Sequence, residues 1–245
     1  MLAMEFGRLL MECGASAAVV DNFSERTARG LGAKRVDLRI GYASLAITVG
    51  VQGEGITRMR KVGPLGVNQR LDHALRQLVG RVERGELTAP SARAELERVV
   101  RETKRHPGWF IDLSVGLACA AFGRLLGVDW SAFLPVFAAA VLGQCLRRQL
   151  LMRHVNVFIT ATLVSFTAAL LSGFGARLVH SLTIDTAMTA AVLLLVPGVP
   201  SINAQNDILE GRPTLGSARA VWVAVILVFI TAGVWLAQIA LGEGH

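Results

Sequence analysis

The stretch VNVFITATLVSFTAALLSGFG, residues 155–175, runs for 21 residues without a charged side chain. The hydrocarbon core of a bilayer is about 30 Å thick, so a helix that spans it needs roughly 20 mostly apolar residues. The run is continuously apolar rather than alternating, which favours a helix over a strand of a membrane barrel. This segment is therefore predicted to be a transmembrane helix.

Similar apolar stretches occur throughout the part of the chain that follows residue 106. The four others are residues 108–127, 131–146, 182–200 and 217–241. Of these, residues 131–146 and 182–200 are short for a span. We therefore predict an α-helical membrane domain of five transmembrane helices over residues 107–245.

The part of the chain before this domain has a different composition. Residues 1–106 carry 18 of the 25 Lys and Arg residues and 12 of the 18 Asp and Glu residues. Apolar spacing and Gly positions predict a small cytoplasmic α+β domain of helix-strand-strand-helix-helix order. The expected elements are helix 3–30, strands 36–51 and 56–62, and helices 67–84 and 91–105.

The loops between the predicted spans differ in basic charge, and this difference sets the expected orientation. Arg147, Arg148 and Arg153 follow the second span, and Arg212 and Arg219 precede the fifth. Because short loops rich in Lys and Arg stay in the cytoplasm, we expect a multi-pass protein with a cytoplasmic N-terminus. An odd number of spans then places the C-terminus outside.

Composition and motifs exclude several classes of function. The basic soluble half has interspersed acidic residues and few aromatic ones, which favours attraction to anionic lipid of the bilayer over binding to nucleic acid. The sequence contains no phosphate-binding loop, no HExxH helix and no GxSxG turn. Cys13, Cys119 and Cys145 lack metal-ligand spacing. We therefore expect no enzyme activity, no cofactor and no metal site.

The most informative polar segment is LLLVPGVPSINAQNDILEGRPTLGSAR, residues 193–219. Pro197, Gly198 and Pro200 are expected to break the fourth span, because Pro removes a backbone donor and clashes with the preceding turn. Backbone that is not helical at membrane depth is tolerated only where it is buried in protein or lines a wet cavity. Interrupted helices of this kind are typical of the binding sites of transporters.

The residues after the break offer a set of polar groups on one helical face. Asn203, Asn206 and Asp207 have i, i+3, i+4 spacing, so a short helix would present amide donors beside a carboxylate. This set suits an amino acid, whose carboxylate would accept from the amides and whose ammonium group would bind Asp207. The alternative is an ordinary cytoplasmic loop in which Asn and Asp make turns.

Other charged residues near the spans are further candidates. A carboxylate within a span is costly and often functional, so Asp185, in the fourth span, is a candidate proton carrier. A dicarboxylate substrate would instead need cationic partners. The available ones on the inner side are Arg147, Arg148, Arg153 and Arg212.

Three segments resemble the threonine/serine exporter family, specifically the longer component of its split, two-subunit systems. They are MECGASAAVVDNFSERTARGLG (11–32), DLRIGYASLAITVG (37–50) and PGVPSINAQNDILEGRPTLGSAR (197–219). The resemblance implies export of threonine and serine, or of succinate in some split systems, across the bacterial inner membrane. It also implies a small partner membrane protein that supplies a second set of spans.

The expected function is therefore that of a secondary-transporter subunit that exports small amino acids (threonine or serine). A succinate or dicarboxylate exporter subunit is the alternative. Because five spans resemble one half of a transporter, a small partner membrane subunit or a homo-oligomer is expected. A membrane scaffold without transport activity is a rival of another class.

Overall fold

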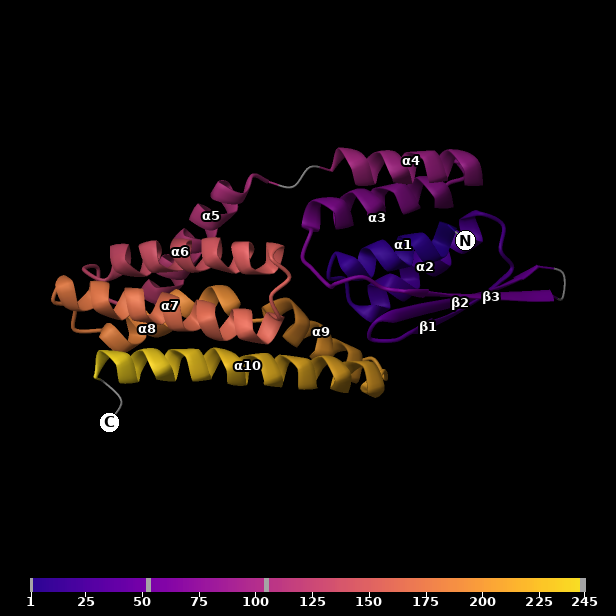
Figure 1. Ribbon diagram of the computed structural model, residues 1–245. Helices are drawn as coiled ribbons and strands as arrows, with labels where there is room; N and C mark the ends of the chain where they lie inside the picture. The colour runs from indigo at the N-terminus through magenta and orange to yellow at the C-terminus, as the bar shows by residue number, and fades with distance from the viewer. Residues whose placement is uncertain (1, 52–53, 104–105, 243–245) are drawn as a thin grey trace. The chain divides into compact units, whose positions relative to one another are not determined.

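The computed structural model describes residues 2–51, 54–103 and 106–242. The chain forms two compact units (Figure 1). The first comprises Met1–Lys104 together with Gly198–Val221, and the second comprises Arg105–Pro197 together with Trp222–His245. Residues 198–221, which the sequence-based division placed in the membrane domain, thus group with the N-terminal residues.

The first unit combines helices with a small antiparallel sheet, as the predicted α+β class requires. The sheet has the order β1-β2-β3, and each strand pairs with the next in the chain. Its N-terminal elements are α1 (Leu2–Glu12), α2 (Ala17–Gly30), β1 (Arg35–Ile40), β2 (Ser44–Val51), β3 (Glu54–Lys61), α3 (Gln69–Glu83) and α4 (Ala89–Glu102).

Two predicted elements are each divided in the structure, so the predicted element order was wrong. The helix expected over residues 3–30 is two helices, because Gly14 has a φ of +91° and Ser16 is extended. The strand expected over residues 36–51 is a hairpin, in which the Gly41 N–H donates to the Ser44 carbonyl at 2.8 Å. In the strand region, the apolar alternation changes from even positions (36, 38 and 40) to odd positions (45, 47 and 49) at the turn, and the prediction did not take this change into account.

The core of the first unit lies between the sheet and the helices. Leu45 and Ile47 of β2 are almost fully buried in one cluster with Phe6 and Leu10 of α1. Leu75 of α3 belongs to the same cluster. This core holds α1, α2 and α3 in place around the sheet.

In the described part of the C-terminal half of the chain, all the regular elements are helices. Its elements are α5 (Gly108–Leu125), α6 (Phe133–Met152), α7 (Val157–Leu178), α8 (Ile184–Val192), the 3₁₀ turn η1 (Leu193–Leu195), α9 (Gly198–Leu209) and α10 (Pro213–Leu241). Helix α9 and the first residues of α10 belong to the first unit, and the other elements form the second.

Among the described residues, three helices are long and apolar enough to cross a membrane: α5, α7 and α10. A fourth span results if the interrupted pair of α8–η1 and α9 is counted as one. Helix α6 has 20 residues, but Arg147, Arg148 and Gln149 near its C-terminus lower its hydropathy. The predicted set of five spans is therefore supported only in part.

Small residues allow the helices of the second unit to approach closely. A Cβ on Gly116 of α5 would lie 3.0 Å from the carbonyl oxygen of Phe137 on α6. A Cβ on Gly233 of α10 would lie 2.5 Å from the carbonyl oxygen of Thr162 on α7. Helices that associate in lipid commonly meet through such residues, because they let the backbones touch.

Candidate functional site

The helix predicted to be broken near Pro197 is interrupted in the structure. Helix α8 ends at Val192, η1 ends at Leu195, and α9 begins at Gly198. Pro200 lies in the first turn of α9, where its missing N–H has no intrahelical partner to lose. The interruption therefore covers residues 193–197.

The polar face predicted on α9 is present, and its residues contact the N-terminal segment. Asn203 donates from Nδ2 to the carbonyl oxygen of Gly14 at 2.9 Å. The carboxylate of Asp207 accepts from the backbone N–H of Ala17 at 3.3 Å and from the guanidinium of Arg219. The Ser16 side chain, at the start of α2, makes no capping hydrogen bond. The carboxylate of Asp207 accepts from the first N–H of this helix instead, and its negative charge is favourable at a helix N-terminus.

These contacts bear on the substrate role predicted for the face. The Asp207 side chain is fully buried and ion-paired to Arg219, which is itself 4% exposed. Asn206 is partly exposed, one turn from Asn203. Asp207 therefore has an ion-pair partner within the chain, and the substrate role expected for it stays a prediction.

The four arginines proposed for an anionic substrate are in different environments. Arg212 pairs with Asp21 at 2.5 Å within the first unit. Arg148 pairs with Asp112 at 2.7 Å within the second unit, where the Asp112 side chain is 6% exposed. Arg153 is exposed at the end of α6.

Arg147 differs from the other three. It is partly buried on α6, and its Nη1 donates to the main-chain carbonyl of Leu194 in η1 at 3.3 Å. Among the described residues, no carboxylate lies within ion-pair distance of its guanidinium. A cation that is partly buried beside a helix interruption thus has a neutral hydrogen-bond acceptor and spare donors.

Further polar groups of the same unit occupy neighbouring positions. A Cβ on Gly143 would meet Val164 of α7 and Leu194, so α6, α7 and η1 meet there. A short loop joins α6 and α7, which run antiparallel. Arg147 lies one turn after Gly143 on α6, and Thr160 lies one turn before Val164 on α7. The two residues therefore lie at a similar height along the two helices. The Thr160 hydroxyl is buried and has no hydrogen-bond partner among the described residues.

Gln144 is a further buried polar residue of α6. It lies one turn before Arg148 on α6, and its side-chain oxygen is buried and has no partner in the described part of the chain. A buried polar atom without a partner costs free energy comparable to a lost hydrogen bond. The sequence signal for this region was the presence of Gln144 and Arg147 in a long apolar helix, and Thr160 was not recognised as part of it.

Asp185 lies in the first turn of α8 and is exposed. A carboxylate in the first turn interacts favourably with the partial positive charge of a helix N-terminus. Its role in proton coupling stays a prediction. Within residues 2–51, 54–103 and 106–242, no three His, Cys, Asp or Glu residues gather in a group that could hold a metal ion.

Comparison with known proteins identifies the family. The model of the family described as "Putative threonine/serine exporter" matches residues 1–240. The chain belongs to the threonine/serine exporter family. This agrees with the resemblance of the three segments in the sequence, and it makes the chain a member of a family of membrane transporters.

Curated relatives cover nearly the whole chain. A protein of Escherichia coli strain K12 named "Probable succinate transporter subunit YjjP" is 31% identical over 237 residues, covering 96% of this chain and 92% of the relative. A protein of Klebsiella aerogenes with the same name is 30% identical over 238 residues, covering 97% and 92%. An uncharacterised protein of Haemophilus influenzae is 26% identical over 271 residues, covering 96% and 89%. No solved structure matches the chain significantly.

Proposed function

We propose that this member of the threonine/serine exporter family is one subunit of a secondary transporter that exports a small dicarboxylate of the succinate type. The proposal places the chain in the bacterial inner membrane with five spans, a cytoplasmic N-terminus and an external C-terminus. It places the substrate at Arg147, beside the helix interruption of residues 193–197.

The observation that carries this proposal is that Arg147 is partly buried and has no carboxylate partner in the described part of the chain. A cationic side chain in a membrane segment is costly unless it is paired, and such residues commonly mark substrate pathways. The Arg147 guanidinium has a carbonyl oxygen as its partner and no carboxylate among the described residues. A substrate carboxylate would supply the missing charge and could accept two parallel N–H bonds. Thr160 and Gln144 would then hydrogen-bond the polar edge of the substrate.

The condition of Asp207 also supports an anionic substrate over an amino acid. An ammonium group would need a carboxylate that is free to pair with it. Asp207 is fully buried and already bound to Arg219 and to the N-terminus of α2. The names of the two relatives with at least 30% identity, which specify succinate, support the same substrate class.

Threonine or serine is the second candidate substrate, and the description of the family favours it. In that case Arg147 would bind the amino-acid carboxylate, and the ammonium group would need another anionic partner, because Asp185 lies nine residues before Leu194 along α8 and η1, about 14 Å away. The two candidates thus share Arg147 and differ in their need for an anionic residue.

We further propose that the chain works with a small partner membrane subunit, since the names of both relatives contain the word subunit. Many transporters place their substrate between two related sets of helices. A homo-oligomer is the alternative way to supply a second set.

The test is substrate flux in proteoliposomes that contain the chain with and without a genomically adjacent small membrane protein. Labelled succinate, threonine and serine are compared for the wild type and for Arg147→Gln. We expect succinate flux that requires both proteins and falls at least about tenfold in Arg147→Gln, since a hydrogen bond to a charged group contributes about 1.5–3 kcal/mol. The matched control is Arg153→Gln, six residues away and exposed at the C-terminal cap of the same helix, which should transport normally.

Each alternative predicts a different pattern of flux. Flux of threonine but not succinate, lost in Arg147→Gln, would support the amino-acid candidate. Full flux from the single chain would support a homo-oligomer. No flux of any substrate from correctly inserted protein would contradict transport and favour a membrane scaffold.

A further inference from the structure

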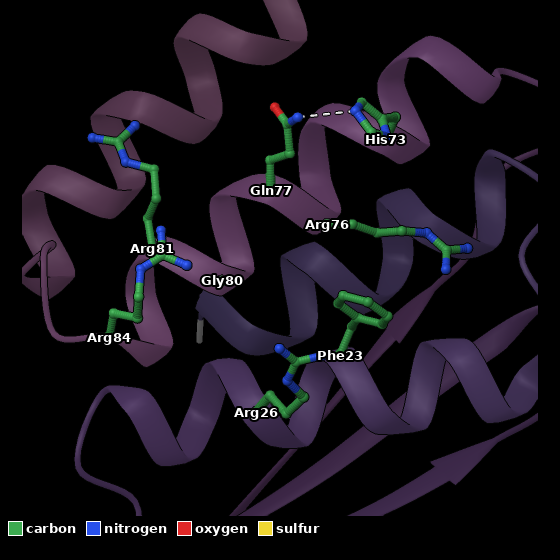
Figure 2. Close-up of a pocket in the computed structure, with 8 residues that line it drawn as sticks. All are labelled: Phe23, Arg26, His73, Arg76, Gln77, Gly80, Arg81 and Arg84. Carbon is green, nitrogen blue, oxygen red and sulfur yellow. Dashed lines mark hydrogen bonds between the residues drawn. The ribbon is translucent and has the colours of Figure 1, made fainter.

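Helices α2 and α3 of the first unit form a hollow of about 610 Å³ that is lined by cationic side chains (Figure 2). Arg26 lies on α2, and Arg76 and Arg81 lie on α3. Arg84 follows at the C-terminal end of α3. Phe23, His73, Gln77 and Gly80 complete the lining, which contains no carboxylate. This set of residues is here named the arginine hollow.

The shape of the arginine hollow follows from the spacing of its residues. On α3 the lining positions run from His73 to Arg84 at intervals of three and four, so they share one face that is about 16 Å long. At one end α2 and α3 approach closely, since a Cβ on Gly30 would lie 3.0 Å from the carbonyl oxygen of Val82. In the middle, Gly80 has no side chain, and an added Cβ would meet only the tip of Arg84, at 3.4 Å.

An aromatic ring fixes two of the guanidinium groups. The Cζ atoms of Arg26 and Arg76 lie 4.9 and 5.1 Å from the centroid of the Phe23 ring. Stacking of this kind orients a planar guanidinium and reduces the entropy that it loses on binding a ligand. His73 and Gln77 are hydrogen-bonded to each other at 2.9 Å on the same face of α3 (Figure 2).

The carboxylates that balance these arginines lie outside the lining. Glu83 accepts from Arg26, Glu86 from Arg84, and Glu95 from Arg81. Five of the six side chains in these contacts are at least 36% exposed, Glu95 being the exception at 19%, and exposed pairs contribute only about 0–1 kcal/mol each. An incoming anion can therefore replace or share them at little cost.

Donors remain available for such an anion. The bonds to Glu83 use Nε and Nη2 of Arg26, and the bond to Glu86 uses Nε of Arg84. The bonds to Asp72 use Nε and Nη2 of Arg76. Each of these guanidinium groups therefore retains at least one terminal nitrogen that is not hydrogen-bonded to another described residue.

We propose that the arginine hollow is a binding site for a soluble anion that carries two or more negative charges on phosphate or carboxylate groups. Four guanidinium groups distributed over about 16 Å exceed what one carboxylate can pair with, and the planar Arg fork matches both phosphate and carboxylate oxygens. The site is separate from Arg147, and it does not depend on the proposed transport function. It assigns a ligand-binding role to the N-terminal unit.

The proposal is tested by calorimetric titration of the purified full-length chain, in detergent at constant ionic strength, with pyrophosphate and with citrate. We expect saturable binding of at least one of them with a stoichiometry of one per chain. The double variant Arg26→Gln/Arg84→Gln should bind about tenfold or more weakly, since each substitution removes hydrogen bonds to a charged group. Both arginines are at least 36% exposed, so this variant should fold normally.

A second variant and a control separate a built site from general attraction to a basic domain. Gly80→Leu adds a side chain within the hollow without removing a charge and should also weaken binding about tenfold or more. The control, Arg93→Gln/Arg101→Gln, removes two charges from exposed positions of α4 and should bind like the wild type. Equal weakening by the control and by the hollow variant would refute the proposal, as would wild-type binding by Gly80→Leu.

Anionic lipid is the other source of the same chemistry. Flotation with vesicles that contain phosphatidylglycerol, with and without the better soluble anion, distinguishes the two. We expect the soluble anion to bind whether or not vesicles are present. Binding of vesicles that requires Arg26 and Arg84, with no binding of pyrophosphate or citrate, would overturn the proposal in favour of a membrane contact.

Discussion

The carboxylate of Asp207 on α9 accepts a hydrogen bond from the guanidinium of Arg219 on α10, and both side chains are almost fully buried. The same carboxylate accepts from the backbone N–H of Ala17 at the start of α2. One residue thus joins three helices of the first unit. The carboxylate that the sequence suggested for binding a ligand thus has partners within the first unit, and its role in binding stays a prediction.

We expect Asp207→Ala to lower the free energy of unfolding of the first unit by about 3–5 kcal/mol, because it leaves Arg219 buried without a counter-ion. Arg219→Leu should have a similar cost, since it leaves the carboxylate unpaired. The double variant Asp207→Leu/Arg219→Leu should be more stable than either single variant. Thermal unfolding of the purified protein in detergent, compared for the four proteins, measures this.

The matched control is the pair of Arg212 and Asp21, which connects α2 to the loop after α9 but is 29% and 40% exposed. Asp21→Ala should cost no more than about 1 kcal/mol, because water screens such pairs. Burial raises the pKa of Asp21, while Arg212 opposes that rise. If Asp207→Ala were as mild as Asp21→Ala, the buried pair would not be what holds α9 in place.

The second prediction concerns Gly14, whose carbonyl oxygen accepts from Asn203. Gly14 has a φ of +91°, and an added Cβ would lie 2.6 Å from the carbonyl oxygen of Gly66. Gly14→Ala therefore combines an unfavourable backbone conformation with a clash against main chain, and it should lower the melting temperature strongly.

Gly32→Ala is the control for Gly14→Ala. Gly32 has nearly the same φ, +92°, but an added Cβ would meet nothing within 4 Å. Its substitution should cost only the backbone term of roughly 1–2 kcal/mol. Equal melting temperatures for the two variants would mean that the close approach to Gly66 is relaxed without cost.

The helical face of α9 could be predicted from the sequence, its contacts with the N-terminal segment could not, and the substrate role of its residues stays a prediction. The i, i+3, i+4 spacing of Asn203, Asn206 and Asp207 is a local property of a helix, and it could be read from the chain. Their partners Gly14 and Ala17 lie 189 and 190 residues earlier. Without a fold, no rule of spacing connects them, so the carboxylate was assigned to a ligand.

The difference between local sequence patterns and contacts of residues far apart in the chain also explains the other results. The apolar runs predicted α5, α7 and α10 well, because hydropathy over about 20 residues is a strong signal. The division of residues 3–30 into two helices depends on one residue, Gly14, with positive φ. The arginine hollow was not predicted at all, because its residues come from two helices that are separated by the whole sheet.

The third prediction concerns pH and Asp129, in the loop between α5 and α6. Its carboxylate accepts from the Ser131 hydroxyl and the Ala132 N–H, and from the Ser181 hydroxyl and the Leu182 N–H of the loop before α8. These hydrogen bonds, that from Ser131 first, lower the pKa of Asp129 to about 2. The carboxylate thus ties two loops at one end of the second unit.

A pKa that is lower in the folded state than the unfolded value of about 3.9 means that ionised Asp129 stabilises the fold. This contribution is complete above about pH 4 and is lost as the pH falls towards 2. Asp129→Asn should therefore melt below the wild type at pH 6, and the difference should shrink between pH 4 and pH 2.5. A difference in melting temperature that stays constant over this range would contradict the role of the charge.

The last prediction is that α6 crosses the membrane although Arg147 and Arg148 lower its hydropathy. Its 20 residues are about 30 Å long, which matches the hydrocarbon core, and its charged end would reach the cytoplasmic interface, where Arg is favoured.

Single cysteines are placed at the two ends by Ser131→Cys and Arg153→Cys, in a background that lacks Cys13, Cys119 and Cys145. We expect a membrane-impermeant maleimide to label Ser131→Cys from outside and Arg153→Cys only after the membrane is opened. Gly85→Cys, in the loop between α3 and α4, is the cytoplasmic reference and should behave like Arg153→Cys. Labelling of the Ser131 and Arg153 variants from the same side would show that α6 does not span, and the five-span arrangement would then be wrong.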